Sequence, residues 1–191
     1  MGHSMKLAGY TVQDVIYAVS DTIVARAQSD AGEQVVLKYQ NNSQASPDLN
    51  ARWQHEHEIL QSIQSKWVIR PLGLKQVDYS LVLVLEDFGT CNLAHLAGQN
   101  IDLADRIALA IQLSEALSAV HEHRLIHGDI SSKNVLVDTV GLRIKLCDFG
   151  LSTRLDHEQK PSADAVLRGT LEYMSPEQTG RTNLDVDYRS D

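Results

Sequence analysis

Cysteine, proline and aromatic residues are all scarce in this chain of 191 residues. The two cysteines, Cys91 and Cys147, are too few for a disulfide framework or a cysteine-rich zinc site. This usage favours a reducing, cytoplasmic compartment. With only 4 prolines and 43% hydrophobic residues, the composition excludes a disordered chain. The longest apolar run, Leu81–Leu85, is far too short to cross a bilayer.

Basic residues are outnumbered by acidic ones, 17 to 25, and the formal net charge is −8. This balance argues against binding to nucleic acid and against direct contact with a membrane surface. The start of the chain lacks the apolar segment of a signal peptide, and we interpret residues 1–9 as a tail or a cloning remnant. His55 and His57 alternate on a predicted helix and do not share a face, so they form no zinc site.

The first half of the sequence predicts short strands around one helix. Apolar and β-branched runs predict strands at Val35–Tyr39, Val68–Leu74 and Leu81–Glu86, with a turn at Asp78. Helical spacing predicts a helix over Asn50–Gln64. The apolar members of this helix are Trp53, Ile59, Leu60 and Ile63.

The second half begins with the strongest helical pattern, over Asp102–His123, where Asp102 is the expected N-cap. Strands follow at Val135–Asp138 and Arg143–Cys147, and the polar stretch after Gly150 is expected to be a long functional loop. The predicted apolar face of the helix is Leu103, Ile107, Ile111, Leu117 and Val120.

Three polar residues of the second half lie in the strings LIHGDISSKNVLV and IKLCDFGL. Asp129 and Asn134 share a loop between helix and strand, and Asp148 opens an Asp-Phe-Gly at a strand end. Phosphoryl transfer needs a carboxylate to orient the accepting hydroxyl and hard oxygen ligands to hold magnesium. Any one of these residues alone would be an ordinary turn residue, but in this order and spacing they resemble the active-site loops of the protein kinase family.

The resemblance implies an α+β, bilobal protein kinase-like fold from about Tyr10 to Asp191. Residues 10–87 would form a small antiparallel-sheet lobe with one main helix. Residues 88–191 would form part of a mostly helical lobe, truncated before its last helices, and we therefore expect this chain alone to be unstable or inactive. The resemblance also implies ATP and Mg²⁺ as cofactors, with Asn134 and Asp148 holding the metal.

Catalysis and nucleotide binding would then use the following residues. Asp129 would receive the substrate hydroxyl, and Lys133 would reach the γ-phosphate, although a solvent-exposed lysine is an equally good interpretation.

Lys38 would bind the α- and β-phosphates and pair with Glu56, which we prefer to Glu58 because it stands three residues before Ile59-Leu60. Backbone groups of Glu86 and Phe88 would meet adenine, and the base would be sandwiched by Val24, Val36 and Leu136.

The string RGTLEYMSPE, which ends at Glu177, resembles the family's substrate-docking segment in its Ser/Thr-specific form, so a protein Ser/Thr hydroxyl is the expected acceptor. Thr170 would hydrogen-bond Asp129, and Glu177 would pair with an arginine beyond this chain. His127, Phe149 and Leu60 resemble the hydrophobic spine. Asp191 resembles the aspartate that anchors the catalytic loop.

Three departures from the family pattern weaken the resemblance. The stretch Tyr17–Val24 lacks the glycines that let backbone amides approach phosphates. Gly128 replaces the arginine that commonly meets a phosphorylated activation loop, so activity is not expected to depend on such phosphorylation and Ser152, Thr153 and Ser162 are weak candidates as switches. Ser131 also stands where Ser/Thr kinases place a lysine.

Two alternatives follow. A pseudokinase would bind nucleotide or act as a scaffold without transferring phosphate. A small-molecule phosphotransferase of the aminoglycoside or choline type would share His-Gly-Asp but usually lacks Asp-Phe-Gly and the docking segment. The final stretch, residues 169–191, most resembles bacterial signalling proteins in which a kinase domain precedes AAA-type ATPase, GAF and histidine kinase regions, so downstream regulatory domains are expected.

Overall fold

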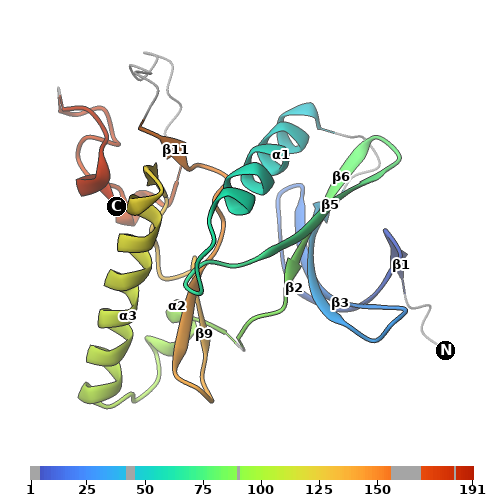
Figure 1. Cartoon of the computed structure of the whole chain (residues 1–191), viewed down its shortest axis with the longest axis horizontal. Helices are drawn as coiled ribbons and strands as arrows, with labels where there is room; N and C mark the ends of the chain where they lie inside the picture. The colour runs from blue at the N-terminus through green and yellow to red at the C-terminus, as the bar shows by residue number, and fades with distance from the viewer. Residues whose placement is uncertain (1–4, 42–45, 90, 156–168, 183) are drawn as a thin grey trace. The chain divides into compact units, whose positions relative to one another are not determined.

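The computed structural model describes residues 5–41, 46–89, 91–155, 169–182 and 184–191 (Figure 1). They form two compact units, the first from residues up to Gln61 together with Ile69–Asp87, and the second from Ser62–Val68 together with Phe88–Asp191. The predicted α+β class, with an antiparallel sheet in the N-terminal part and one main helix beside it, is confirmed. Among the helices of the described ranges, none combines the length and the apolar character needed to cross a membrane.

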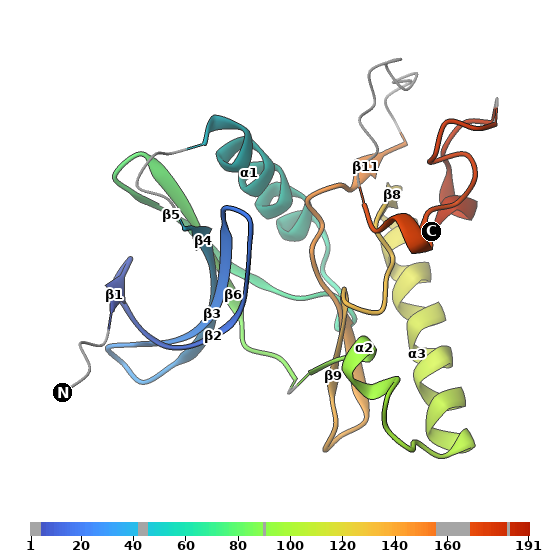
Figure 2. The same cartoon turned by 180° about the vertical axis from the view of Figure 1, so that it is seen from behind.

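The first unit is built on a curled six-stranded antiparallel sheet in the order β1-β2-β3-β4-β6-β5 (Figures 1 and 2). The strands are β1 (Lys6–Leu7), β2 (Tyr10–Val19), β3 (Thr22–Ser29), β4 (Gln34–Gln40), β5 (Pro71–Val77) and β6 (Ser80–Glu86). Helix α1 (Pro47–Ser62) follows β4 and buries Trp53, Ile59 and Leu60, as predicted.

The core of this sheet follows from its period-two pattern. Val35, Leu37 and Tyr39 alternate along β4 and are all buried, together with Ala25 and Ala27 of the neighbouring β3. Because this face of β3 and β4 is buried, the register between the two strands is fixed by which of their residues are apolar.

Strand β5 begins three residues later than predicted. Val68 does not join the first sheet but forms a parallel bridge with Leu146 in the second unit. The turn at Asp78 is confirmed, and its φ of 53° is the left-handed conformation that aspartate tolerates well.

The second unit contains the helices α2 (Leu93–Leu96) and α3 (Leu103–Glu122), and the short 3₁₀ turns η1 (Leu171–Tyr173) and η2 (Tyr188–Ser190). Its strands are β7 (Cys91–Asn92), β8 (Leu125–Ile126), β9 (Val135–Asp138), β10 (Arg143–Leu146) and β11 (Thr153–Arg154). They form one sheet in the order β10-β9-β7 and a second pair, β11-β8.

Helix α3 starts where the sequence predicted, because the Asp102 side chain accepts a hydrogen bond of 2.8 Å from the Asp105 N–H. Its predicted apolar face was largely wrong. Leu103 is 72% exposed, and Ile107 and Ile111 are also exposed. Val120 is buried as predicted, and the other residues that pack inward are Leu109 and Ala116. Helix α3 carries apolar residues on more than one side, so their spacing alone could not show which face packs on β8 and β10.

Candidate functional site

In the first unit, Lys38 of β4 and Glu56 of α1 form a buried ion pair. The Lys38 Nζ lies 2.8 Å from Glu56 Oε2, and the two side chains are 8% and 1% exposed. The rival residue Glu58 instead accepts a hydrogen bond of 2.7 Å from Gln54 Nε2 at the exposed surface. The structure thus pairs Lys38 with Glu56 rather than Glu58, as predicted, while the role of the pair in nucleotide binding stays a prediction.

The glycine-free stretch Tyr17–Val24 forms a regular hairpin between β2 and β3. Val19 is opposite Thr22, so the turn consists of Ser20 and Asp21. Ser20 has a φ of 50°, the conformation that a glycine would adopt without strain. The hairpin therefore holds its shape through strand pairing rather than through flexible glycines.

The residues expected around adenine lie on four strands and a connecting segment. In the first unit, Val24 is buried and Val36 is half-buried, opposite Leu85 of β6. The Glu86 N–H donates to the Arg70 carbonyl at 3.0 Å, so adenine would have to meet the Glu86 carbonyl.

In the second unit, Leu136 of β9 is half-buried. The Lys145 Nζ lies 5.1 Å from the centre of the Phe88 ring, a cation–π contact that holds this ring in place. No contact of either residue with a nucleotide follows from these positions, and both assignments stay predictions.

Asp129 lies on the loop between β8 and β9, and both of its carboxylate oxygens accept hydrogen bonds. Oδ1 accepts from the Thr170 N–H at 2.7 Å, and Oδ2 accepts from the Asn134 side-chain amide at 2.9 Å. The same Asn134 Nδ2 donates to the Asp129 carbonyl at 2.8 Å. Thr170 therefore bonds Asp129, as predicted, but through its main chain.

Asn134 and Asp148, the predicted magnesium ligands, come from chain segments that are hydrogen-bonded to each other. The Cys147 N–H donates to the Asn134 carbonyl at 3.0 Å, which places Asp148 next to Asn134. Since Asn134 uses its Nδ2 on Asp129, its Oδ1 is the remaining polar atom, and it accepts no hydrogen bond from the described residues. Amide and carboxylate oxygens are the hard donors that Mg²⁺ prefers, and the two residues stay predicted ligands.

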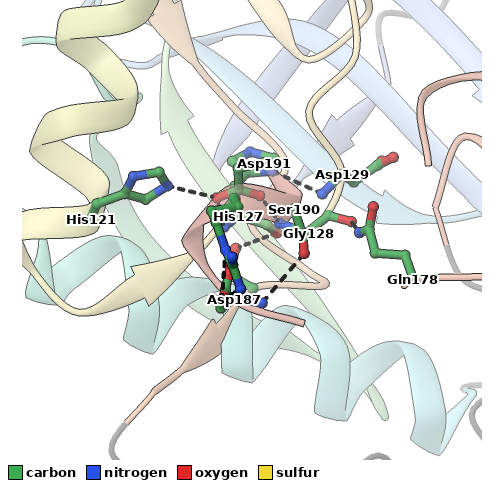
Figure 3. Close-up of polar contacts among 10 residues, drawn as sticks. His121, His127, Gly128, Asp129, Gln178, Asp187, Ser190 and Asp191 are labelled. Atoms are coloured by element: carbon green, nitrogen blue, oxygen red, sulfur yellow. Dashed lines mark hydrogen bonds and ion pairs between the residues drawn. The ribbon is translucent and has the colours of Figure 1, made fainter. Parts of the chain in front are cut away.

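Asp191 anchors the loop that carries Asp129, as predicted. Its Oδ2 accepts from the His127 N–H and its Oδ1 from the Gly128 N–H, both at 2.8 Å (Figure 3). The Asp191 side chain is 1% exposed, and His121 Nε2 of α3 lies 3.0 Å from its Oδ2. This contact of His121 was not predicted, because a single polar residue on a helix carries no motif.

His127 is fully buried and packs against Phe149, with ring centres 4.5 Å apart. Its Nε2 faces the Cys147 carbonyl at 3.0 Å, and its Nδ1 accepts the Asp129 N–H at 3.3 Å. These partners require a neutral ring protonated on Nε2. Burial lowers the pKa of His127 below its ordinary value of 6.5, against the opposing charge of Asp191.

The segment 169–178 is hydrogen-bonded to the same loop at further points that the sequence did not indicate. The Tyr173 hydroxyl lies 2.7 Å from Ser132 Oγ, and Gln178 Nε2 donates to the Gly128 carbonyl at 2.9 Å. Tyr173 and Ser132 lie within the two motif strings, but neither was assigned a role, and Gln178 lies directly after the second string.

Glu177 Oε1 accepts a hydrogen bond of 2.6 Å from Ser190 Oγ. This bond holds the pKa of Glu177 below its ordinary range. The predicted arginine partner of Glu177 was placed beyond this chain and stays a prediction.

The remaining predicted residues differ in exposure. Lys133 is exposed and Ser131 is buried. Ser152 is only 1% exposed and donates to the His127 carbonyl at 3.0 Å, so its hydroxyl has a structural role. Thr153 of β11 is exposed, and Ser162 lies outside the described residues.

Comparison with known proteins identifies relatives of most of the chain. The protein kinase domain family matches residues 20–191, a range that begins within the atypical hairpin. A probable serine/threonine-protein kinase, kinX, of Dictyostelium discoideum is 33% identical over 75% of this chain and 13% of its own length. A mitogen-activated protein kinase kinase kinase 1b of Physcomitrium patens is 32% identical over 65% of this chain and 16% of its own.

An L-type lectin-domain containing receptor kinase IX.1 of Arabidopsis thaliana is 32% identical over 71% of this chain and 22% of its own length. This chain therefore spans less than a quarter of the length of each of these three relatives.

Proposed function

Because the chain belongs to the protein kinase domain family, we propose that it transfers the γ-phosphate of ATP to Ser or Thr hydroxyls of a protein. The observation that carries the proposal is the arrangement of Asp129, which is oriented by Asn134 from one side and by the Thr170 N–H from the other. A carboxylate fixed in this way presents its remaining lone pairs in a defined direction, where a substrate hydroxyl would meet it.

In the proposed reaction, the oxygen of the substrate hydroxyl attacks the γ-phosphorus, and the bond from phosphorus to the bridging oxygen of ADP breaks. The hydroxyl proton passes to Asp129, and ADP leaves with the electron pair of the broken bond. When bound at Asn134 and Asp148, Mg²⁺ would supply positive charge against the phosphate oxygens. Lys38, oriented by Glu56, would hold the α- and β-phosphates, and Lys133 would approach the γ-phosphate from solvent.

The family match favours a protein acceptor over the small-molecule phosphotransferase alternative. The pseudokinase alternative is favoured by one observation, the hairpin Tyr17–Val24, which lacks the glycines that would bring amides to the phosphates. We also propose that the chain acts in cytoplasmic signalling. Because residues 169–191 resemble bacterial signalling proteins in which a kinase domain precedes regulatory domains, we propose the same domain order here.

Phosphate transfer to casein from ATP labelled at its γ-phosphate tests the proposal. We expect label on Ser and Thr after acid hydrolysis, dependent on Mg²⁺ and abolished by a chelator. A thermal shift with Mg-ATP but no transfer to casein or to the protein itself would favour the pseudokinase and overturn the proposed activity.

A further inference from the structure

Gln178 links the turn after the docking segment to the residue directly before Asp129. Its Nε2 donates to the Gly128 carbonyl at 2.9 Å, and Figure 3 shows the side chain directed at this main-chain group. Nine residues upstream, Gly169 lies so close that a Cβ there would stand 3.2 Å from Asp129 Oδ1. The segment therefore contacts the Asp129 loop at both of its ends.

The orientation of the Gln178 amide is fixed by a second set of partners. Its Oε1 accepts from the Ser175 N–H at 3.0 Å and from Ser175 Oγ at 3.2 Å. Since the oxygen faces two donors, the nitrogen must face the Gly128 carbonyl, which can only accept. One side chain thus closes the turn on itself and attaches it to the loop.

Position 128 can take part in this attachment only through its main chain. Gly128 has a φ of +80°, and an added Cβ would lie 3.0 Å from the Leu151 carbonyl oxygen. A side chain that reaches out from this position to a phosphate is therefore disfavoured by both backbone and space. The neutral amide of Gln178 supplies the connection from the opposite direction.

We propose that Gln178 is a positioning residue for the transfer reaction, holding the substrate-docking segment on the Asp129 loop without any phosphorylated residue. This inference rests on the proposed function. It identifies the residue that holds the docking segment at the same site without phosphorylation. It predicts that the docking segment is already in place in the unmodified protein.

Gln178→Glu in the full-length protein tests the inference. The new carboxylate keeps the acceptor for Ser175 but puts an oxygen against the Gly128 carbonyl. We expect the KM for casein to rise roughly three- to tenfold, as for the loss of one half-buried hydrogen bond, with the KM for ATP unchanged. Thr179→Val is the matched control, because among the described residues Thr179 Oγ1 has its hydrogen bond within the same turn, to the Pro176 carbonyl at 2.7 Å.

Treatment of the wild type with a phosphatase completes the test, and we expect its KM for casein to stay unchanged. An unaltered KM in Gln178→Glu, or a phosphatase-treated wild type with a raised KM, would overturn the inference. If Gln178→Glu does not fold, Gln178→Met removes the same donor without adding charge and takes its place.

Hydrogen exchange separates this inference from the proposed activity. The amides of residues 169–178 should exchange faster in Gln178→Glu than in the wild type, whether or not the protein transfers phosphate. Equal exchange in the two proteins would overturn the role of Gln178. If exchange differs between the two proteins but the wild type transfers no phosphate, only the proposed function is overturned.

Discussion

Asn134 donates hydrogen bonds to two atoms of Asp129, the main-chain carbonyl at 2.8 Å and the carboxylate Oδ2 at 2.9 Å. The amide therefore fixes both the backbone and the side chain of the residue proposed to receive the substrate hydroxyl. Because its nitrogen bonds Asp129, its own oxygen is the atom proposed to hold Mg²⁺.

Asn134→Asp should lower kcat for phosphate transfer on the order of 100-fold or more, because a carboxylate at this position would repel both acceptors on Asp129. Steady-state kinetics with casein at saturating ATP would measure the loss. Circular dichroism provides the folding control, and a folded variant with wild-type kcat would contradict the proposed orientation of Asp129.

The Lys38–Glu56 pair leads to a prediction about nucleotide binding. Lys38→Ala should remove the thermal shift caused by Mg-ATP, and it should also lower stability by about 3–5 kcal/mol, since it leaves Glu56 buried without this cation. Urea unfolding and thermal-shift titration measure the two effects. Glu58→Gln is the matched control, because Glu58 lies on the same helix but faces Gln54 at the surface. An ATP shift retained in Lys38→Ala would exclude Lys38 from the nucleotide site.

Gly128→Ala should destabilise the protein more than Gly180→Ala. Both glycines have positive φ, +80° and +68°, so each substitution costs about 1–2 kcal/mol of backbone strain. Only at Gly128 does an added Cβ also meet a neighbour, the Leu151 carbonyl oxygen at 3.0 Å. Chemical unfolding of the two variants compares them, and equal losses would mean that the loop around Gly128 relaxes to accept a side chain.

The protein should lose stability as the pH falls below about 6.5, in part because of His127. Burial lowers the pKa of this ring in the folded state, so the unfolded chain binds the proton more readily. The contribution is fully present above the unfolded pKa and is lost as the pH falls toward the folded value. His127→Phe should show a weaker loss between pH 7 and pH 5.5 in urea unfolding than the wild type, and identical pH profiles would contradict this role.

The sequence predicted what depends on local pattern and motif spacing. The N-cap at Asp102, the buried residues of α1 and the pairing of Lys38 with Glu56 all follow from residue type and position. The exposed face of α3 could not be predicted in this way, because Leu103 and Ile107 fit helical spacing as well as Leu109 does. Which face is buried depends on the strands that pack on the helix, and these lie later in the sequence.

The hydrogen bonds made by Gln178 and Tyr173 could not be predicted for a different reason. Each joins a residue near position 175 to a loop more than forty positions earlier, as the separations of 50 and 41 residues show. A single glutamine or tyrosine carries no periodicity or motif that marks such a partner. Only the folded chain brings them together.

The most direct test of the account is single-turnover phosphate transfer by the wild type and by Asp129→Ala, each saturated with Mg-ATP. We predict that the wild type phosphorylates Ser or Thr residues of casein, and that Asp129→Ala still binds ATP but transfers its γ-phosphate at least about 100-fold more slowly. Equal transfer rates in the two proteins would contradict the assignment of Asp129 and, with it, the proposed mechanism.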